Sequence, residues 1–447
     1  MRFIYYLILI ILLFKTGACK KYLDEKPDKS LIVPTTIEDL QRILNDNFTL
    51  NVSTCAYGEV STDDYFLLDE SYNALEDFDR KSYTWKKFDY NYPNQWSHNY
   101  NKVYYANFCL EQVNKFYATA HDTKTNNVKG SALFFRAFSF LNLAIDYCKA
   151  YDQSTSNTDL GMVLRLGTDF NEKSVRSSVE ETYSQIISDL KLATNLLPNQ
   201  ASNVMKPSKA ASLGLLARTY LLVRNYDSAL KYSNLSLQIK NDLLDYNSIP
   251  APDASIPFPQ YNLEIVFYSD MSTEFLSKSP SRALIDTLLF NSYDNDDLRK
   301  YIFFMPNGLF HSYKGSYAAD AEIFFSGIAV DEIILTRAES YARKNMLIEA
   351  STDMNYLLSK RWITGEYNEM QFSSQEQAVD FILLERRKEL LMRGLRWPDI
   401  KRLNKEGRNI ILNRKVGSQA FLLPPNDSFY ALPLPTDILR ITGIQQN

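Results

Sequence analysis

Cys19 stands directly behind a short apolar segment, in a setting where its thiol could carry a lipid. Twelve consecutive apolar residues, FIYYLILIILLF, follow Arg2, and the small residues Gly17 and Ala18 come directly before Cys19. Twelve residues are too few to span a hydrocarbon core of about 30 Å, but they suit the apolar part of a signal peptide. Small residues before a cysteine are what a lipoprotein signal peptidase requires. We therefore expect residues 1–18 to be a lipoprotein signal peptide and Cys19 to be lipidated.

The segment after this cysteine, CKKYLDEKPDKS, is polar and contains Pro27. Proline disfavours helix and alternating charges stay solvated, so we expect residues 19–35 to form an extended tether. Two or three acyl chains would hold it firmly on a membrane, because each buried CH₂ contributes about 0.8 kcal/mol. Thr16 stands where such signals usually have leucine, so a signal peptide without lipidation and a buried N-terminal helix are the alternatives.

Aromatic side chains are the second group that could bind a ligand. The chain has 30 Tyr and 26 Phe against 4 Trp and 3 His. A sugar presents apolar C–H faces and polar edges, and a tyrosine offers a flat apolar face with a polar tip. Two irregular stretches supply the ligand-binding candidates, which are Trp85, Tyr90, Trp96, Tyr313 and Tyr317. Packing in the core is the alternative for each of them, most of all for Trp96, which begins a helix.

Glu385 and Glu389 lie one helical turn apart, a spacing that could serve acid–base chemistry. They belong to the segment ERRKELLMRGLRWPDIKRL, in which arginines alternate with them and Trp397–Pro398 interrupts the helix. We interpret the two carboxylates as part of an ion-pair network that braces this bend, not as a catalytic pair.

Signatures of other chemistries are missing from the sequence. No two glycines stand two residues apart, which excludes G-x-G-x-x-G and G-x-S-x-G, and neither G-x-x-x-x-G-K-[ST] nor H-E-x-x-H occurs. The three histidines are far apart, and although a Ser–His–Asp triad could assemble in space, no serine is singled out. The four cysteines lack C-x-x-C spacing, and three would remain after lipidation, so neither a zinc site nor a disulfide framework is indicated. We expect no catalytic residue, no metal and no cofactor.

The elements that position these residues are mostly helical. Apolar residues recur at helical spacing after Thr36, which is a predicted N-cap, from Gln95 onward, and from Thr182 to a stop at Pro198. Over residues 126–151 the apolar residues cover most of the helix circumference, which predicts a buried helix.

Two later segments share one packing pattern. LLARTYLLVRNYDSAL contains Ala217, Tyr220 and Ala229, and LTRAESYARKNMLIEA has the same residue types 121 positions later. Small residues where paired helices cross, followed by a tyrosine, are typical of tetratricopeptide repeats, so we expect about four helix pairs. Because the offset is far longer than one repeat, residues 241–327 are predicted to be a long irregular insertion, and loops of this length usually carry function.

Composition and charge limit the class of partner. The chain has 447 residues, 45% of them hydrophobic and 23% charged, so it can bury a substantial core. Its net charge is −4, from 49 basic and 53 acidic residues without a long run of either sign. A nucleic-acid backbone would require a basic face, so we expect no nucleic acid partner.

In this order the segments resemble the SusD/RagB family, which comprises outer-membrane nutrient-binding lipoproteins of the Bacteroidetes. The resemblance rests on CKKYLDEKPDKS, GEVSTDDYFL, QWSHNYNKVYYANFCLEQV, FFRAFSF, DLGMVLRL, the repeat segments, ERRKELLMRGLRWPDIKRL and FLLPPNDSFYALPLPTDIL. Each segment is degenerate alone, but together they are specific and extend over nearly the whole chain. The closing LRITGIQQN departs from the usual family ending, which affects only the expected contacts of the tail.

The resemblance implies an all-α-dominated fold of about four tetratricopeptide-like helix pairs with long irregular insertions. It implies one domain over residues 36–447, with an N-terminal helical part (36–240), the insertion (241–327) and a C-terminal part (328–447). It further implies a non-enzymatic lipoprotein on the cell surface, anchored in the outer membrane, that captures a glycan and passes it to a SusC-like TonB-dependent transporter.

Three other functions compete with this expectation. A RagB-type member of the same family would bind an oligopeptide in place of the glycan. A surface-anchored hydrolase would need a carboxylate pair or a nucleophile in the insertions. An intracellular repeat scaffold would leave the apolar N-terminus and Cys19 unexplained.

Overall fold

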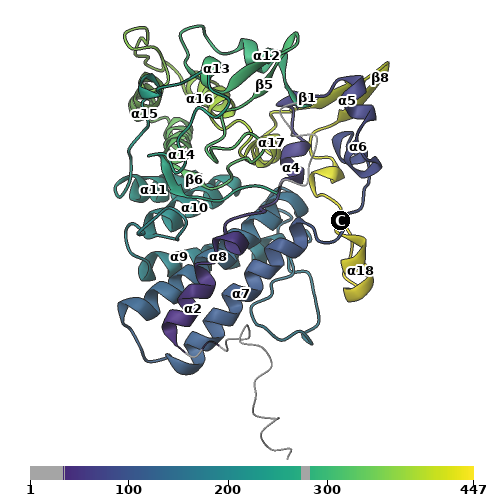
Figure 1. Cartoon of the computed structure of the whole chain (residues 1–447), viewed down its shortest axis with the longest axis vertical. Coiled ribbons are helices and arrows are strands. Elements are labelled where there is room, and N and C mark those ends of the chain that lie inside the picture. The colour runs from purple at the N-terminus through teal and green to yellow at the C-terminus, as the bar shows by residue number, and fades with distance from the viewer. Residues whose placement is uncertain (1–33, 35, 273–281) are drawn as a thin grey trace, which may run out of the picture.

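Helices dominate the fold, as the sequence predicts, and the strands are short (Figure 1). The computed structural model describes residue 34, residues 36–272 and residues 282–447. The predicted signal peptide, Cys19 and nearly all of the predicted tether lie outside these residues.

Two groups of helices make up the scaffold. The first group runs from α2 to α11 and comprises α2 (Ile37–Leu44), α3 (Asn47–Leu50), α4 (Tyr57–Val60), α5 (Asp69–Asn73), α6 (Asp77–Tyr83), α7 (Gln95–Phe116), α8 (Thr123–Tyr147), α9 (Val179–Leu196), α10 (Lys209–Leu222) and α11 (Tyr226–Leu237). The second group comprises α12 (Thr287–Asn291), α13 (Arg299–Ile302), α14 (Val330–Arg343), α15 (Leu347–Ser359), α16 (Gln375–Glu389), α17 (Arg396–Asn404) and α18 (Thr436–Thr442).

The named strands pair two by two, and every pair is antiparallel. The pairs are β1 (Tyr65–Phe66) with β3 (Leu284–Ile285), β2 (Ile265–Phe267) with β6 (Ile328–Ala329), β4 (Phe304–Asn307) with β5 (Phe310–Tyr313), and β7 (Leu412–Val416) with β8 (Gln419–Leu423). Between α11 and α14 the described residues form only short helices, short strands and a 3-10 turn at Tyr246–Ser248, which agrees with the irregular stretch predicted there.

The helix starts follow from local side-chain chemistry. Thr36 is the N-cap of α2, as predicted, and its hydroxyl accepts a hydrogen bond from the Asp39 amide at 3.2 Å. Asn94 caps α7 in the same manner, with Ser97 returning a bond to the Asn94 amide at 3.0 Å. These side chains satisfy amides that the helix itself leaves without partners.

Consecutive long helices pack on one another, α7 on α8, α8 on α9, α10 on α11 and α14 on α15. Helix α11 also packs on α14, so the two similar segments lie side by side in Figure 1. The small residues of the repeat pattern are almost fully buried where these helices meet, as predicted: Ala217, Ala229, Ala338 and Ala350.

Helix α8 is the centre of this scaffold. By length and composition it could cross a membrane, but 94% of its most apolar window is buried inside the protein. It therefore acts as a core helix, which confirms the prediction from its apolar circumference. One hydrophobic cluster extends through the protein from Leu40 near the start of the described residues to Leu434 near their end.

Asp79 of α6 should make stability depend on pH. Burial raises the pKa of its carboxyl to about 6, with Glu76 adding to the rise and Arg282 opposing it. An unfolded aspartate titrates near pH 4. Because the folded pKa is higher, the contribution of Asp79 to stability is complete below about pH 4 and is lost as pH rises through 6. We predict that the free energy of unfolding of Asp79→Asn, relative to that of the wild type, rises by about 2–3 kcal/mol as the pH is raised from about 4 to 7.

Urea denaturation across this pH range measures the effect. Asp77→Asn is the matched control in the same helix, because Asp77 is exposed and the hydrogen bond from Lys81 lowers its pKa. That variant should show only a small change, of opposite sign. A constant difference between Asp79→Asn and the wild type across pH would contradict the prediction.

Candidate functional site

Four of the five predicted ligand-binding rings are packed inside the protein. Trp85, Tyr90, Tyr313 and Tyr317 expose between 3% and 9% of their surface. The Trp85 ring nitrogen donates to the Ser61 carbonyl at 3.0 Å, and Tyr90 packs edge-on against another tyrosine with ring centroids 4.7 Å apart.

The two rings from the later stretch are held in the same way. The Tyr313 hydroxyl donates to the Gly315 carbonyl at 2.7 Å, and Tyr317 shares a hydrogen bond of 2.9 Å with Tyr246. Burying a ring of this size in the core is more favourable than leaving it in water. Sequence alone does not distinguish a buried ring from an exposed one. A ligand role for these four residues stays a prediction, and it would require each ring to leave its packed position.

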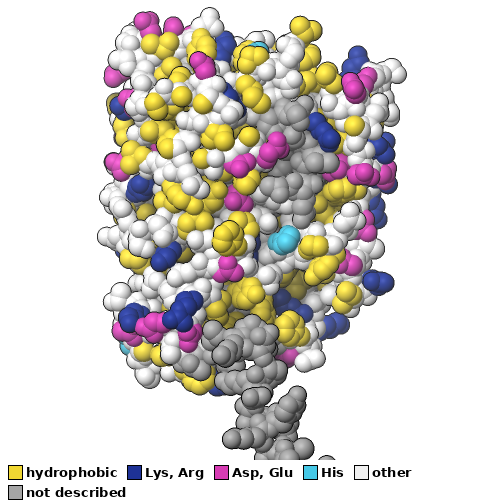
Figure 2. Space-filling view, in the orientation of Figure 1, with side chains coloured by type: hydrophobic (Ala, Val, Ile, Leu, Met, Phe, Trp, Pro, Cys, Tyr) yellow, Lys and Arg dark blue, Asp and Glu magenta, His cyan; other side chains and the backbone are white. Residues whose placement is uncertain are grey.

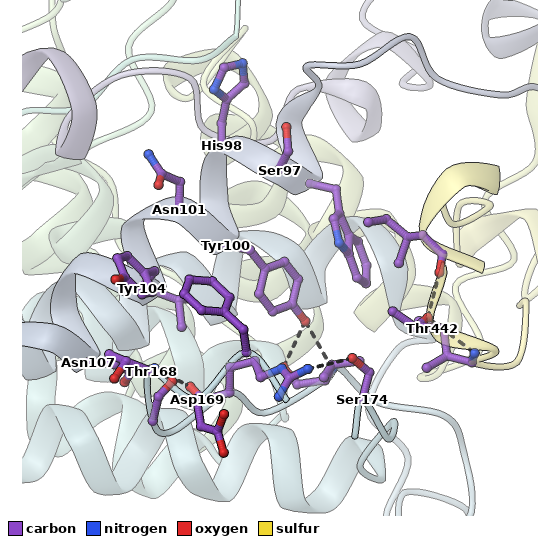
Figure 3. A pocket seen from close by; sticks show the side chains of 18 of the residues that line it. Ser97, His98, Tyr100, Asn101, Tyr104, Asn107, Thr168, Asp169, Ser174 and Thr442 are labelled. Atoms are coloured by element: carbon purple, nitrogen blue, oxygen red, sulfur yellow. Dashed lines mark hydrogen bonds between the residues drawn. The ribbon is translucent and has the colours of Figure 1, made fainter. Parts of the chain in front are cut away.

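Trp96, the fifth predicted residue, lines a cavity of about 770 Å³ although it exposes only 4% of its surface. The cavity lies between α7, the loop of residues 161–178 and the C-terminal segment with α18 (Figure 3). Its volume is in the range of small-molecule sites. The lining combines five aromatic rings with polar side chains, among them Tyr92, Trp96, Tyr100, Tyr104, Phe170, Ser97, His98, Asn101, Thr168, Asp169, Ser174 and Thr442.

Helix α7 places the rings, because residues four apart lie on the same face of a helix. Trp96 and Tyr100 have ring centroids 4.8 Å apart, and Tyr104 stacks on Phe170 of the 161–178 loop at 5.3 Å with an angle of 27°. Tyr92 and Phe170 are open to solvent, with 75% and 82% of their surface exposed. In Figure 3 the rings of Tyr100 and Tyr104 point from α7 toward the loop.

The 161–178 loop is fastened to α7 by direct hydrogen bonds. The Tyr100 hydroxyl donates to the Val163 carbonyl at 2.9 Å and accepts from the Val163 amide at 3.1 Å. Farther along α7, the Asn107 side chain donates to the Arg165 carbonyl at 2.8 Å. Burial raises the pKa of Tyr100, so its hydroxyl keeps its proton and can both donate and accept. These hydrogen bonds therefore hold the 161–178 loop, which forms one wall of the cavity, in a defined position against α7.

A buried ion pair supports this attachment from behind. Arg136 makes two hydrogen bonds of 2.7 Å to Asp189 on α9 and a third, of 3.0 Å, to the Asn107 side-chain oxygen. At the far end of the contact, the Glu111 carboxylate accepts from the Thr168 amide at 2.8 Å. Arg136 of α8 and Glu111 of α7, which lie outside the cavity lining, thus hold Asn107 and the loop in position.

The cavity is nearly neutral. Among the described residues that line it, the groups with a permanent charge are Arg165 and Asp169. Arg165 is already engaged, since it donates to the Ser174 hydroxyl at 2.8 Å and lies 3.4 Å from the Glu172 carboxylate. Figure 2 likewise shows acidic and basic side chains mixed over the face in view, without a wide patch of one sign.

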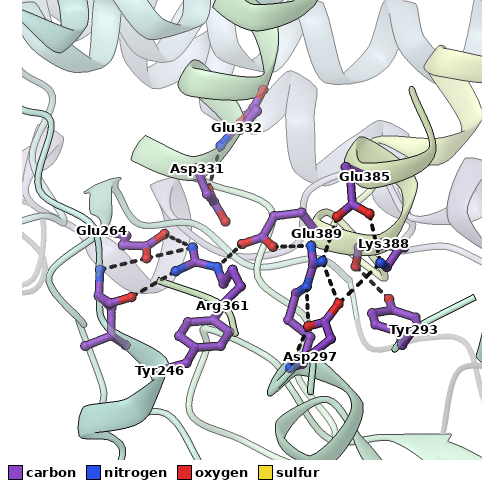
Figure 4. A network of polar contacts seen from close by, with 12 residues as sticks. Tyr246, Glu264, Tyr293, Asp297, Asp331, Glu332, Arg361, Glu385, Lys388 and Glu389 are labelled. Carbon is purple, nitrogen blue, oxygen red and sulfur yellow. Dashed lines mark hydrogen bonds and ion pairs between the residues drawn. The ribbon is translucent and has the colours of Figure 1, made fainter. Parts of the chain in front are cut away.

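A second chemical candidate lies deep in the core. The carboxylates of Glu264, Asp331 and Glu389 approach one another within 4.8 Å, a spacing that could suit a metal ion. Arg361 instead donates to both oxygens of Glu264, at 2.8 and 3.0 Å, and to Glu389 at 2.7 Å (Figure 4). Arg393 pairs with Asp331 at 2.5 Å. Guanidinium groups already supply the positive charge that these carboxylates require.

The same network explains Glu385 and Glu389. The prediction of an ion-pair network is confirmed, and its arginine partners come from outside the segment that contains the two glutamates. Arg299, from the stretch before α14, donates to Glu385 at 2.6 Å and to Glu389 at 2.9 Å (Figure 4). Arg386 points elsewhere and pairs with an aspartate of α17 at 2.8 Å.

The cysteines among the described residues belong to the packed interior. Cys55, Cys109 and Cys148 are unpaired and buried. Burial raises the pKa of each thiol, to about 12 for Cys109 and about 11 for Cys148. Thiols that keep their protons in this way are poor nucleophiles and poor metal ligands.

Comparison with known proteins finds a family model that matches part of the chain and solved structures with the same fold. A family model described as "Starch-binding associating with outer membrane", of the SusD-like type, matches residues 21–221. The structure is similar to that of a SusD superfamily protein from Bacteroides thetaiotaomicron, with a TM-score of 0.76 and 21% identity over 92% of this chain and 100% of that one. Residues 21–221 thus match a SusD-like family model, and the chain as a whole shares the fold of the SusD superfamily structures.

Other SusD-like structures share the fold over similar lengths. A putative sugar binding protein from Bacteroides vulgatus has a TM-score of 0.74 at 20% identity, covering 93% of this chain and 99% of that one. A SusD-like carbohydrate binding protein from the same organism has a TM-score of 0.70 at 19% identity, covering 92% and 97%. A search of curated proteins finds no match.

Several rings of the cavity were not among the sequence candidates. Tyr100 and Tyr104 follow Trp96 at intervals of four, and this spacing was a usable signal for a shared helix face. Phe170 carried no such signal, because it joins the cavity only through the path of the 161–178 loop.

Proposed function

We propose that this protein is a cell-surface lipoprotein of the outer membrane that binds a nutrient glycan and passes it, uncleaved, to a SusC-like TonB-dependent transporter. One observation carries the binding function, namely the cavity of about 770 Å³ between α7 and the 161–178 loop, with its exposed rings and polar rim. Aromatic faces can stack on the apolar C–H faces of sugars, while Ser97, Asn101 and Asp169 can bond to hydroxyl groups.

The names of similar proteins support the same ligand class. The matching family model carries the words starch-binding and outer membrane, and two similar structures from Bacteroides vulgatus are described as sugar or carbohydrate binding. A protein that captures a ligand outside the outer membrane needs a channel through which the ligand can cross that membrane. A SusC-like TonB-dependent barrel is the partner that this role requires.

The anchor and the domain boundaries belong to the same proposal. Residues 1–18 act as a lipoprotein signal peptide, Cys19 carries the lipid and residues 19–35 form the tether. Residues 36–447 then form one domain with parts 36–240, 241–327 and 328–447. The single hydrophobic cluster that runs through helices of both groups supports one domain over several.

Weak binding is sufficient for this task. A dissociation constant near 1 mM corresponds to about 4 kcal/mol, which a few stacking contacts and hydrogen bonds can provide. Glycoside hydrolysis instead uses two carboxyl groups on either side of the bond. Asp169 is the one carboxylate among the described residues lining the cavity, which favours capture over cleavage there.

Removing either ring of the stacked pair Tyr104 and Phe170 should weaken glycan binding. We expect Tyr104→Ala and Phe170→Ala each to reduce affinity by about two- to tenfold, the range of a lost aromatic stack. Isothermal titration calorimetry of the purified protein against a panel of oligosaccharides and oligopeptides measures this. Phe48→Ala is the matched control, since Phe48 is 93% exposed and lies outside the cavity lining.

The panel also separates the competing functions. Binding of peptides in place of glycans, weakened by the same two substitutions, would assign the RagB-type alternative. Release of shortened sugars during incubation would show a hydrolase. Glycan binding that is unchanged in Tyr104→Ala and Phe170→Ala would place the site elsewhere.

A further inference from the structure

A second cavity lies where the two similar helix hairpins turn, α10 into α11 and α14 into α15. Its volume is about 620 Å³, and its lining consists of Tyr151, Gln153, residues 223–227, Arg343 and Lys344. The helices that carry most of this lining pack on one another (Figure 1). The cavity shares no lining residue with the one at α7, and most of its side chains are polar. It is therefore a separate place with room for a small polar ligand.

The two hairpins turn with the same backbone geometry but with different residues. Arg224 lies just after α10, Asn345 lies 121 residues later just after α14, and both have a positive φ, of 59° and 57°. In each turn the amide of the next residue donates to the carbonyl of the repeat tyrosine at 2.9 Å. This left-handed position after a helix favours glycine or asparagine. An arginine is unfavourable for the backbone there, so the reason for Arg224 has to lie in its side chain.

The Arg224 side chain lines the cavity without a carboxylate partner. Its guanidinium donates to the Tyr151 carbonyl at 2.7 Å and forms no ion pair with any residue in the described part of the chain. A guanidinium has five N–H groups in a planar fork and cannot lose its charge in a protein. Most of these donors, and the whole positive charge, therefore remain for a ligand.

The other charges of the lining are close to balance. Arg343 is offset by Glu339 and Glu406, at 2.8 and 2.7 Å. Lys344 pairs with Asp227, but the two side chains are 37% and 80% exposed, and an ion pair this open is weak. Helix α10 ends at the cavity and α11 begins there, so the opposite ends of two helix dipoles offset each other. What remains is one uncompensated positive charge.

We propose that this cavity binds an oxyanion, a carboxylate or a sulfate group, on the guanidinium of Arg224. The arginine fork matches two oxygens of such a group, and hydrogen bonds between charged partners are the stronger kind. The Gln153 amide and the Lys344 ammonium belong to the same lining and can donate to the remaining oxygens. A free inorganic ion and the acidic group of a sugar share this chemistry. The proposal does not depend on glycan binding at the cavity beside α7.

The test gives the first turn the residue that the second turn already has. Because asparagine suits the left-handed backbone, Arg224→Asn should fold with a urea midpoint no lower than that of the wild type. We expect D-glucuronate and inorganic sulfate to bind the wild type with dissociation constants on the order of 1 mM, and Arg224→Asn to weaken both by about tenfold or more. Isothermal titration calorimetry of the purified protein at constant ionic strength measures the affinities. In the NMR spectrum of the wild type, both anions should shift the Arg224 Nε–H signal, whereas neutral D-glucose should not.

Arg408→Asn is the matched control, because Arg408 is a surface arginine outside this cavity and its loss should leave both affinities unchanged. Tighter binding of glucuronate than of sulfate would assign an acidic sugar as the source of the anion, and the reverse order would assign an inorganic ion. Equal affinities in the wild type and Arg224→Asn, or an Arg224 signal that neither anion shifts, would overturn the proposal. So would a clear loss of stability in Arg224→Asn, because the arginine would then serve the fold through its bond to Tyr151. None of these outcomes affects the glycan-binding function proposed for the α7 cavity.

Discussion

Replacing Arg361 by methionine is expected to lower the free energy of unfolding by about 3–5 kcal/mol, which is the usual cost of removing one partner from a buried ion pair. Arg361 is fully buried and contacts two carboxylates, Glu264 and Glu389, as well as the Leu244 carbonyl at 2.8 Å. Without the guanidinium, three carboxylates within 4.8 Å of one another would have one cation fewer between them.

The loss should depend on pH in a definite direction. Burial raises the pKa of Glu264 to about 7, and Arg361 is the main influence that opposes this rise. Once Arg361 is gone, Glu264 can relieve the repulsion only by taking a proton, which is easier in acid. We therefore expect a smaller loss near pH 5 than near pH 8, measured by urea denaturation at both values.

A surface arginine provides the control for this variant. Arg408 pairs with Asp380, and both side chains are more than a third exposed, so Arg408→Met should cost less than about 1 kcal/mol. Adding Glu264→Gln to Arg361→Met should recover part of the stability. A loss for Arg361→Met no larger than that for Arg408→Met would contradict the assigned role of the network.

The helical scaffold could be predicted because its signals are local. The N-cap at Thr36, the helix that begins at Gln95 and the alanine pattern around Ala217 and Ala338 each depend on residues within a few turns. The similarity of two segments 121 residues apart further indicated related helix pairs, and α11 does pack on α14. Packing of an apolar helix such as α8 follows from the same patterns.

The ligand site could be predicted only in part, because burial and long-range contacts decide it. Trp85 and Tyr313 stand in irregular sequence that is typical of exposed loops, yet long-range packing covers their rings. Trp96 reaches the cavity, but the opposite wall depends on the bonds between Tyr100 and Val163, which are 63 residues apart. Likewise, one partner of Glu389 is Arg299, 90 residues earlier, and no local spacing indicated that pair.

Membrane attachment should depend on one thiol. We expect Cys19→Ala to lower the membrane-bound fraction on the order of a hundredfold, because two or three acyl chains hold a protein far more firmly than any single weak contact. Among the described residues, α8 is the helix with the length and composition to span a bilayer, and it is committed to the core. Helix α8 therefore cannot replace the lipid as a membrane anchor.

Fractionation of outer membranes, with the mass of the N-terminal peptide of the mature protein, measures this effect. The wild-type peptide should begin at Cys19 and carry the added mass of its acyl chains. Cys55→Ala is the matched control, since Cys55 is a buried free thiol and its loss should leave the protein in the membrane fraction. In the Cys19→Ala chain the native signal peptide is replaced by a cleavable one of the non-lipoprotein type. Without this replacement the apolar segment would stay uncleaved and could itself act as an anchor. If that chain still sediments with the outer membrane, the lipid is not the anchor, and the tether proposed for residues 19–35 loses its basis.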